Sequence, residues 1–166
     1  LRIKSEDKYS SSNEKVASAI QKYSDIPVID LLDFWKRLLF CYLTANGDMH
    51  LKNWSLLEIT SLKGLFQLSP CYDFLNTRLA IPKEKTDIGL TIAGGKQRNL
   101  QWTYFRDFAR SMNIEQETID SVRAQLNAWY SVIEMRIGVS GLDAEKKITY
   151  LEIARDRLSI LNQHPA

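Results

Sequence analysis

A short polar segment constrains this chain more than any other part of its sequence. Residues 46–53 read Asn-Gly-Asp-Met-His-Leu-Lys-Asn, so that an acid, a histidine and an amide stand at the spacing D-x-H-x-x-N. An Asp in such a loop can orient and deprotonate an attacking hydroxyl, and an Asn five residues later can reach a magnesium ion on the same nucleotide. The spacing therefore predicts that Asp48 and Asn53 belong to a phosphotransferase catalytic loop.

The sequence after Asn53 predicts a β-hairpin that leads to a second acid. Residues 54–59 have strand character, residues 60–64 form a turn that ends in Gly, and residues 65–68 are the returning strand. Such a hairpin would bring Asp73 back beside Asn53, where a kinase-type site holds its metal ions between the loop Asn and a second Asp. This order of acid, amide, hairpin and acid is more specific than an isolated Asn-Gly-Asp, which is most often a simple turn.

Composition predicts a globular chain without a strongly charged surface. The 166 residues are 45% hydrophobic and carry a formal net charge of +2, with acids and bases interspersed. The length predicts one domain, and the charge balance gives no basic stripe for direct nucleic-acid binding. Cys41 and Cys71 form no C-x-x-C pair or Cys/His cluster, which predicts free thiols in the reducing cytoplasm and no zinc site. No signal peptide and no apolar run near 18 residues is present, so no membrane partner is expected.

Apolar periodicity predicts helices on both sides of the hairpin. Residues 1–12 are polar and Ser-rich and are expected to form a flexible N-terminal segment, followed by one folded domain at 13–166. Helices are expected to end near Tyr23, to begin at Pro27, and to occupy residues 102–111, 115–137 and 144–161. The helix from Pro27 would deliver the catalytic loop. The segment after Asp73, through Lys96, is expected to be irregular and to face a substrate, with a turn at Gly94-Gly95-Lys96.

The same periodicity predicts which side chains the helices bury. In the first helix these are Val16, Ala19, Ile20 and Tyr23, and the second helix is expected to be buried on most sides, Ile29 included. In the helix at 115–137 the core stripe is expected to comprise Ile119, Val122, Leu126, Trp129, Ile133 and Ile137. In the last helix the polar side is expected to carry Arg155, Asp156 and Arg157.

Two motifs together resemble the C-terminal lobe of the HipA-type serine/threonine kinase toxins. They read N-G-D-M-H-L-K-N-W-S-L-L and L-S-P-C-Y-D-F-L-N-T, and the resemblance covers most of the chain. It implies the C-lobe of a protein-kinase-like fold, mainly α with a small β-hairpin. It also implies the site residues: Asp48 as the catalytic base, Asn53 and Asp73 as Mg²⁺ ligands, His50 and Lys52 near the phosphates of ATP, and Tyr72 lining the nucleotide pocket.

Two departures from ordinary protein kinases accompany the resemblance. His50 stands where those enzymes usually keep a Lys, and Asp73-Phe74-Leu75 replaces D-F-G. Neither a Gly-rich loop nor a strand Lys for the phosphates precedes Asp48, so the chain alone is expected to bind ATP feebly. The start at Leu1 in place of Met is expected of a fragment of something longer.

The resemblance implies transfer of the ATP γ-phosphoryl group to a Ser or Thr hydroxyl of a protein, within a toxin–antitoxin system. An aminoacyl-tRNA synthetase is then a candidate target and a DNA-binding antitoxin a candidate partner. Two alternatives remain open. The loop order also resembles lipid kinases, which would make the acceptor an inositol or another small hydroxyl compound. The chain could instead be a binding module or half of a split kinase, complemented by a separate N-lobe chain.

Overall fold

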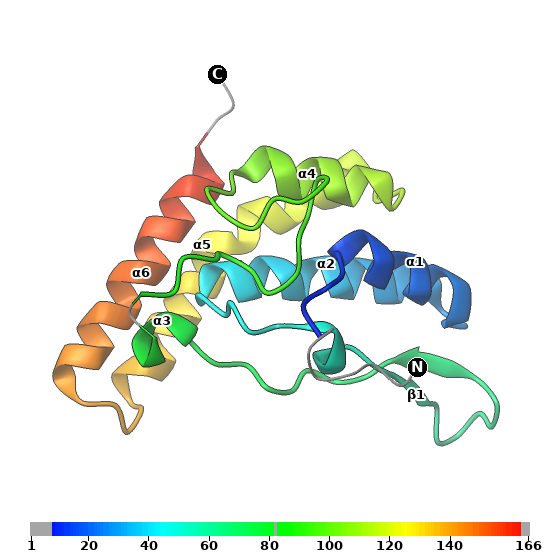
Figure 1. Ribbon diagram of the computed structural model, residues 1–166, viewed down its shortest axis with the longest axis horizontal. Helices are drawn as coiled ribbons and strands as arrows, with labels where there is room; N and C mark the ends of the chain where they lie inside the picture. The colour runs from blue at the N-terminus through cyan, green and yellow to red at the C-terminus, as the bar shows by residue number, and fades with distance from the viewer. Residues whose placement is uncertain (1–7, 82, 164–166) are drawn as a thin grey trace.

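Helices make up most of the structure, a computed structural model that describes residues 8–81 and 83–163 (Figure 1). The elements follow in the order α1 (Asn13–Tyr23), α2 (Pro27–Leu43), the short 3₁₀ helix η2 (Leu51–Asn53), β1 (Leu56–Glu58), β2 (Phe66–Leu68), α3 (Thr77–Ala80), α4 (Trp102–Ser111), α5 (Gln116–Gly138) and α6 (Ala144–Asn162). The predicted mainly α fold with a small hairpin is confirmed. In the described ranges, no helix has both the length and the apolarity needed to cross a membrane.

Helix α2 lies at the centre of the fold, with α1, α4 and α6 packed against it (Figure 1). Pro27 occupies its first turn, where a missing N–H costs no hydrogen bond. Its core side chains include Phe34, Trp35 and Leu39, which are fully buried. Trp35 Nε1 also donates a hydrogen bond of 2.9 Å to the carbonyl of Phe105 in α4. The end of α2 at Leu43 is therefore a rigid support for the loop that follows.

The hairpin is shorter than the sequence predicts. Strands β1 and β2 pair antiparallel over three residues each, with Leu56 opposite Leu68. After Glu58 one more cross-strand hydrogen bond forms, from Ile59 N to Leu65 O at 2.7 Å. The chain then turns, with Leu62 N donating to Ile59 O at 2.8 Å and Gly64 at a φ of +83°. The buried Asp30 at the start of α2 accepts a hydrogen bond of 2.6 Å from Leu68 N. This contact fixes the returning strand against the helix that carries the catalytic loop.

The predicted helix boundaries agree with the structure to within about one residue, but some predicted faces are wrong. Helix α1 packs against α2 through Val16, Ala17 and Ile20, so that Ala19 faces solvent and Tyr23 is 57% exposed. Ile29 is 64% exposed because the first turn of α2 extends past the core. In α6, Arg157 is only 4% exposed, although the sequence pattern places it on the polar side.

The segment between Asp73 and α4 is mostly irregular, as predicted, but it contains the single-turn helix α3. Asn76 caps this turn, since its Oδ1 accepts from Leu79 N at 3.1 Å. The chain then enters the core, where the buried side chains are Asp87, Ile88, Leu90 and Ile92. The predicted turn at 94–96 is present, with positive φ at Gly94 and Gly95 and a hydrogen bond of 2.7 Å from Lys96 N to Ile92 O.

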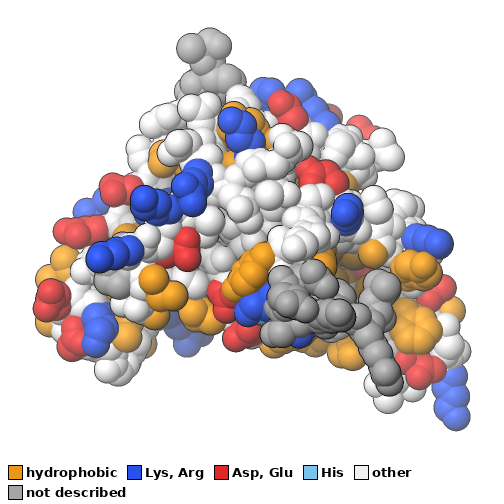
Figure 2. All heavy atoms as spheres, viewed as in Figure 1, with side chains coloured by type: hydrophobic (Ala, Val, Ile, Leu, Met, Phe, Trp, Pro, Cys, Tyr) orange, Lys and Arg blue, Asp and Glu red, His pale blue; other side chains and the backbone are white. Residues whose placement is uncertain are grey.

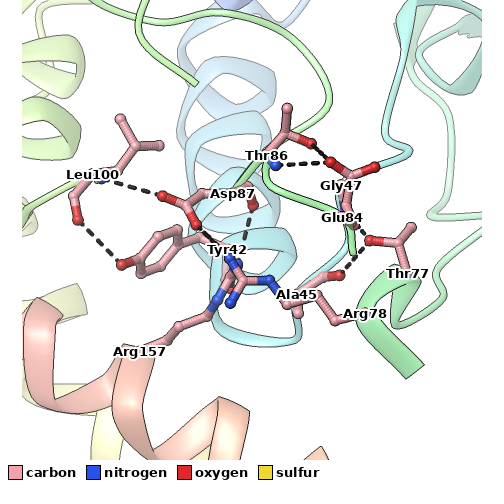
Figure 3. A network of polar contacts seen from close by, with 10 residues as sticks. All are labelled: Tyr42, Ala45, Gly47, Thr77, Arg78, Glu84, Thr86, Asp87, Leu100 and Arg157. Atoms are coloured by element: carbon pink, nitrogen blue, oxygen red, sulfur yellow. Dashed lines mark hydrogen bonds and ion pairs between the residues drawn. The ribbon is translucent and has the colours of Figure 1, made fainter. Parts of the chain in front are cut away.

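A buried polar network holds this segment to α2 and α6 (Figure 3). The guanidinium of Arg157 donates to the carbonyls of Tyr42 and Asp87 and, at 3.1 Å, to the Asp87 carboxylate. Arg78 of α3 donates to the same carboxylate at 3.0 Å, and Leu100 N donates to its other oxygen at 3.3 Å. Burial, with a smaller effect from Arg78, lowers the pKa of Arg157 to about 10, so the group stays cationic at neutral pH. Arg157 therefore acts as an internal cross-link between three parts of the fold.

Basic and acidic side chains are interspersed on the face of the molecule that Figure 2 shows. No region of that face carries a single sign of charge over several neighbouring elements. This distribution agrees with the formal net charge of +2 over 166 residues.

Candidate active site

The candidate catalytic loop is held in place by its own polar side chains. Asn46 is fully buried, and its Oδ1 accepts from Asp48 N at 3.2 Å while its Nδ2 donates to Asp73 O at 3.5 Å. His50 N donates to Asp48 O at 2.8 Å, and Asn53 N donates to His50 O at 3.0 Å, which closes the turn that becomes η2. The loop geometry is thus set before any ligand binds.

The side chain of Asn53 joins the two candidate acids. Its Nδ2 donates to Asp73 Oδ2 at 2.9 Å and to the carbonyl of Asp48 at 3.3 Å. Asp73 lies beside Asn53 as the hairpin prediction expects, because β1 and β2 return the chain to its starting point. Asp73 has a φ of +58°, a left-handed conformation that Asp tolerates better than most residues. Asp48, Asn53 and Asp73 therefore form one cluster.

This cluster offers the donor set that Mg²⁺ prefers. Among the described residues, the hydrogen bonds of these two side chains use Asn53 Nδ2 and Asp73 Oδ2, which leaves Asn53 Oδ1 and Asp73 Oδ1 available to a ligand. One amide oxygen and one carboxylate oxygen are hard ligands, and Mg²⁺ is commonly held by one or two carboxylates together with nucleotide phosphates. The residues present fit a magnesium–nucleotide complex.

Residues just before α1 contact the candidate base. The Tyr9 hydroxyl donates to Asp48 Oδ1, and Lys8 Nζ lies 3.9 Å from the same oxygen. Burial and the hydrogen bond to Asp48 raise the pKa of Tyr9 to about 12, so the phenol keeps its proton. Lys8 O also accepts from Leu51 N at 3.1 Å. Residues 1–7 of the predicted flexible segment lie outside the described residues. The predicted boundary between this segment and the folded domain, after residue 12, stays a prediction.

A cavity of about 410 Å³ opens beside Asp48. Lys8 and Tyr9 line one part of it, and α3 with the loop after it lines another, through Thr77, Ile81 and Glu84 among others. The Glu84 carboxylate accepts from Thr86 N and Oγ1, which lowers the pKa of Glu84 and keeps it ionised. The segment that the sequence predicts to face a substrate therefore borders the space in front of Asp48.

The other predicted site residues, His50, Lys52 and Tyr72, differ in burial and in their contacts. His50 is buried, its ring lies edge-on to Tyr9 at 5.4 Å, and its Nδ1 has no hydrogen-bond partner in the described chain. Lys52 is exposed, and its carbonyl accepts a hydrogen bond of 2.9 Å from the Tyr72 hydroxyl. Tyr72 is partly exposed beside the cluster but does not line the cavity at Asp48. Their roles stay predictions.

Two small contacts that the motif does not reveal support the loop. The Thr77 hydroxyl donates to Ala45 O at 2.9 Å and accepts from Gly47 N at 3.0 Å. Gly89 packs directly on the backbone of Met49, so that a Cβ at residue 89 would lie 2.6 Å from Met49 O. A Gly inside an apolar run, here Ile88-Gly89-Leu90, is a known sign of such close backbone approach. The sequence therefore contains an indication of the role of Gly89, whereas it contains none of the role of Thr77.

Replacing Gly89 by Ala is expected to destabilise the chain by about 1–3 kcal/mol, the usual cost of overpacking a filled site. The clash is with backbone atoms of Met49, which cannot rotate away as a side chain could. Urea unfolding measures the change. Gly138→Ala is the matched control, because nothing lies within 4 Å of a Cβ there. Equal stability of Gly89→Ala and wild type would contradict the close approach.

This chain is similar to known proteins in sequence and in fold. The family described as HipA-like C-terminal domain matches residues 1–132. The protein named "Putative kinase Y4dM" of Sinorhizobium fredii (strain NBRC 101917 / NGR234) is 49% identical over 57 residues, which are 34% of this chain and 13% of that protein. A solved structure, the Shewanella oneidensis MR-1 toxin–antitoxin complex of HipA, HipB and operator DNA, matches with a TM-score of 0.64 and 19% identity.

The structural match covers 90% of this chain and 35% of the solved chain, so this chain spans only a part of both relatives. At 19% identity the match shows the fold, which is kinase-like. The family match is independent of that likeness and extends over most of the sequence, including the D-x-H-x-x-N loop, the hairpin and Asp73. The chain therefore belongs to the HipA-like C-terminal domain family.

Proposed function

We propose that this chain is the C-terminal catalytic lobe of a HipA-like Ser/Thr protein kinase, which transfers the ATP γ-phosphoryl group to a protein hydroxyl in the cytoplasm. One observation carries the proposal. The Asn53 amide contacts both the Asp48 carbonyl and the Asp73 carboxylate, so the acid, the amide and the second acid of the motif lie together. Membership in the HipA-like family and the kinase-like fold support the same reading.

Asp48 is the general base in this proposal. Its Oδ1 accepts from Tyr9, which fixes the carboxylate and leaves Oδ2 to accept the proton of the incoming hydroxyl. The cavity of about 410 Å³ beside Asp48 receives the acceptor side chain. As the hydroxyl oxygen bonds to the γ-phosphorus, the bond from that phosphorus to the bridging oxygen of ADP breaks and Asp48 holds the released proton.

Asn53 and Asp73 would hold the magnesium ion of a bound nucleotide, and this ion would neutralise charge on the phosphates. His50 and Lys52 lie in the same loop on either side of Leu51 and would approach those phosphates, and Tyr72 would border the nucleotide. The Tyr72 hydroxyl donates a hydrogen bond to the Lys52 carbonyl, so the Tyr72 ring and this loop form one surface. In this proposal each predicted site residue therefore has one role: general base, metal ligand or contact to the nucleotide.

The metal role predicts that Asp73→Asn weakens magnesium support of the reaction. Loss of a carboxylate ligand should raise the Mg²⁺ concentration needed for half-maximal transfer by at least about tenfold. The measurement is phosphoryl transfer against Mg²⁺ concentration in the longer protein that contains this lobe. Asp107→Asn, on the exposed face of α4, is the matched control. An unchanged Mg²⁺ dependence of Asp73→Asn would remove Asp73 from the metal site.

A separate N-lobe should complete the nucleotide site. The sequence ahead of Asp48 contains no Gly-rich loop and no strand Lys for the phosphates, so the 166-residue chain alone should bind ATP at least about tenfold more weakly than with that lobe. Calorimetric titration of ATP with Mg²⁺ into both forms gives the comparison. Tight binding by the chain alone would show that it carries a phosphate clamp of its own.

We propose the partners of this kinase by analogy with the solved relative. That structure is described as a complex of HipA with HipB and operator DNA. A DNA-binding antitoxin is therefore the partner we propose, with a protein, such as an aminoacyl-tRNA synthetase, as the phosphorylated substrate. Co-purification of this chain's longer protein with the product of a neighbouring antitoxin gene, followed by phosphoryl-transfer assays on candidate substrates, tests both.

A further inference from the structure

A second and larger hollow lies between α2, the segment 71–74, α5 and α6, and we call it the α5 groove. It has a volume of about 720 Å³, within the range of small-molecule sites, and shares no lining residue with the cavity at Asp48. Its walls are mainly apolar, with Phe40, Phe74, Trp129, Val132, Ile133 and Ile137. Two of these residues, Ile133 and Ile137, lie beyond residue 132, where the family match ends. The α5 groove is thus built partly by sequence outside the matched part of the family.

The charges around the α5 groove have one sign. Lys36, Arg37 and Arg136 line it, and no Asp or Glu does. The Arg37 side chain is 12% exposed; its terminal nitrogens donate to Ser69 O and Asp33, but its Nε is buried without a hydrogen-bond partner in the described residues. Arg37 is therefore already engaged inside the protein, whereas Lys36 and Arg136 have no ion-pair partner among the described residues and can pair with a ligand carboxylate.

We propose that the α5 groove binds a small amphipathic carboxylate, whose apolar body packs against Phe40, Trp129 and Ile133 and whose carboxylate pairs with Lys36 and Arg136. The apolar walls provide the area that the hydrophobic effect requires, and the cations select an acid over an alcohol or an amine. Charge complementarity favours an acid as the occupant, because a neutral hydrocarbon would leave Lys36 and Arg136 without an ion-pair partner.

A ligand in the α5 groove can affect the candidate active site through the two sequence neighbours of Asp73. Tyr72 and Phe74 both line the groove, and Asp73 between them has its left-handed backbone conformation. A ligand that holds Tyr72 and Phe74 in one arrangement also selects one position of the Asp73 carboxylate. This regulatory consequence rests on the proposed function, whereas binding itself does not.

The test of binding uses decanoate on the 166-residue chain, below its micelle-forming concentration. Decanol and decyltrimethylammonium have the same chain length with a neutral or a cationic head. Calorimetry, together with the fluorescence of Trp129 in the groove wall, should show decanoate binding at least about tenfold more tightly than either. Equal affinity for decanol, or no binding of decanoate, would overturn the proposal.

Variants locate the bound acid. Arg136→Gln should weaken decanoate binding about fivefold, and Val132→Glu, which places a negative charge at the partly exposed groove wall, at least about tenfold. Arg110→Gln, an exposed cation at the end of α4, is the control and should leave the affinity unchanged. Circular dichroism confirms that each variant is folded. Equal effects of Arg136→Gln and Arg110→Gln would place the ligand elsewhere.

Cys71 gives an independent readout. It lines the α5 groove and is exposed, whereas Cys41 is buried, so a maleimide should react first at residue 71. Saturating decanoate should slow this reaction at least about fivefold. Absence of protection, or dimerisation of the chain through the groove in sedimentation experiments, would count against a small acid as the occupant. Decanoate binding by the chain, together with no phosphoryl transfer by the longer protein that contains this lobe, would refute the proposed kinase function and leave the groove assignment intact.

Discussion

Asp48→Asn is expected to reduce phosphoryl transfer by about two to four orders of magnitude, the usual scale for loss of a positioned general base. The amide cannot take the proton of the acceptor hydroxyl, although it can still accept the hydrogen bond that Tyr9 donates to Asp48. The loop contacts of Asn46 and Asn53 use backbone atoms of Asp48, so they survive the substitution. The longer protein that contains this lobe is the sample, with ATP, Mg²⁺ and a protein acceptor.

The controls separate chemistry from folding. Asp48→Asn should unfold at the same urea concentration as wild type, because Asp48 is a partly exposed loop residue. Asp107→Asn makes the same chemical change on the surface of α4 and should transfer phosphate normally. A fully active Asp48→Asn protein would exclude Asp48 as the base and, with it, the proposed mechanism.

The largest expected effect on stability is that of Arg157→Leu, which should destabilise the chain by about 3–5 kcal/mol. The substitution removes three hydrogen bonds to Tyr42 and Asp87 and leaves the Asp87 carboxylate buried with the partly exposed Arg78 as its remaining ion-pair partner. It also removes the guanidinium that lies over the Tyr42 ring, 4.7 Å from its centroid. Urea unfolding followed by tryptophan fluorescence measures the change.

A matched variant and a double variant sharpen this result. Arg155→Leu makes the same change on the exposed side of α6 and should leave stability unchanged. Adding Asp87→Asn to Arg157→Leu should recover part of the loss, because the buried side chain at residue 87 is then neutral and the Arg78 cation that it leaves is partly exposed. If Arg157→Leu and Arg155→Leu unfold alike, the buried network contributes nothing to the fold.

The network and the candidate site are coupled through one segment. Asp87 is anchored by Arg157, and two residues later Gly89 packs on Met49, between Asp48 and His50. Loss of the Arg157 contacts should therefore disturb the catalytic loop as well as the core. A partial loss of transfer in Arg157→Leu, measured at a temperature where the protein remains folded, is the result that this connection predicts.

Local sequence alone determined the helix boundaries, the presence of a hairpin after Asn53 and the identity of the D-x-H-x-x-N loop. These features depend on periodicity, on turn residues and on spacing within about 25 residues, all of which are visible in the chain itself. The return of Asp73 to Asn53 follows from them, because a hairpin reverses the chain. The wrong predictions at Tyr23 and Ile29 show the limit, since a helix pattern does not say where the neighbouring helix ends.

Only the tertiary structure decided which polar residues entered the interior and what surrounds Asp48. Tyr9 reaches Asp48 across 39 positions, and Arg157 reaches Asp87 across 70 and Tyr42 across 115. A buried Arg and a surface Arg have the same appearance in a helical pattern, because the partner that compensates the cost of burial lies elsewhere in the chain. The α5 groove likewise exists only where α2, α5 and α6 leave space between them. Such contacts depend on how the helices pack, and no local rule of sequence contains that information.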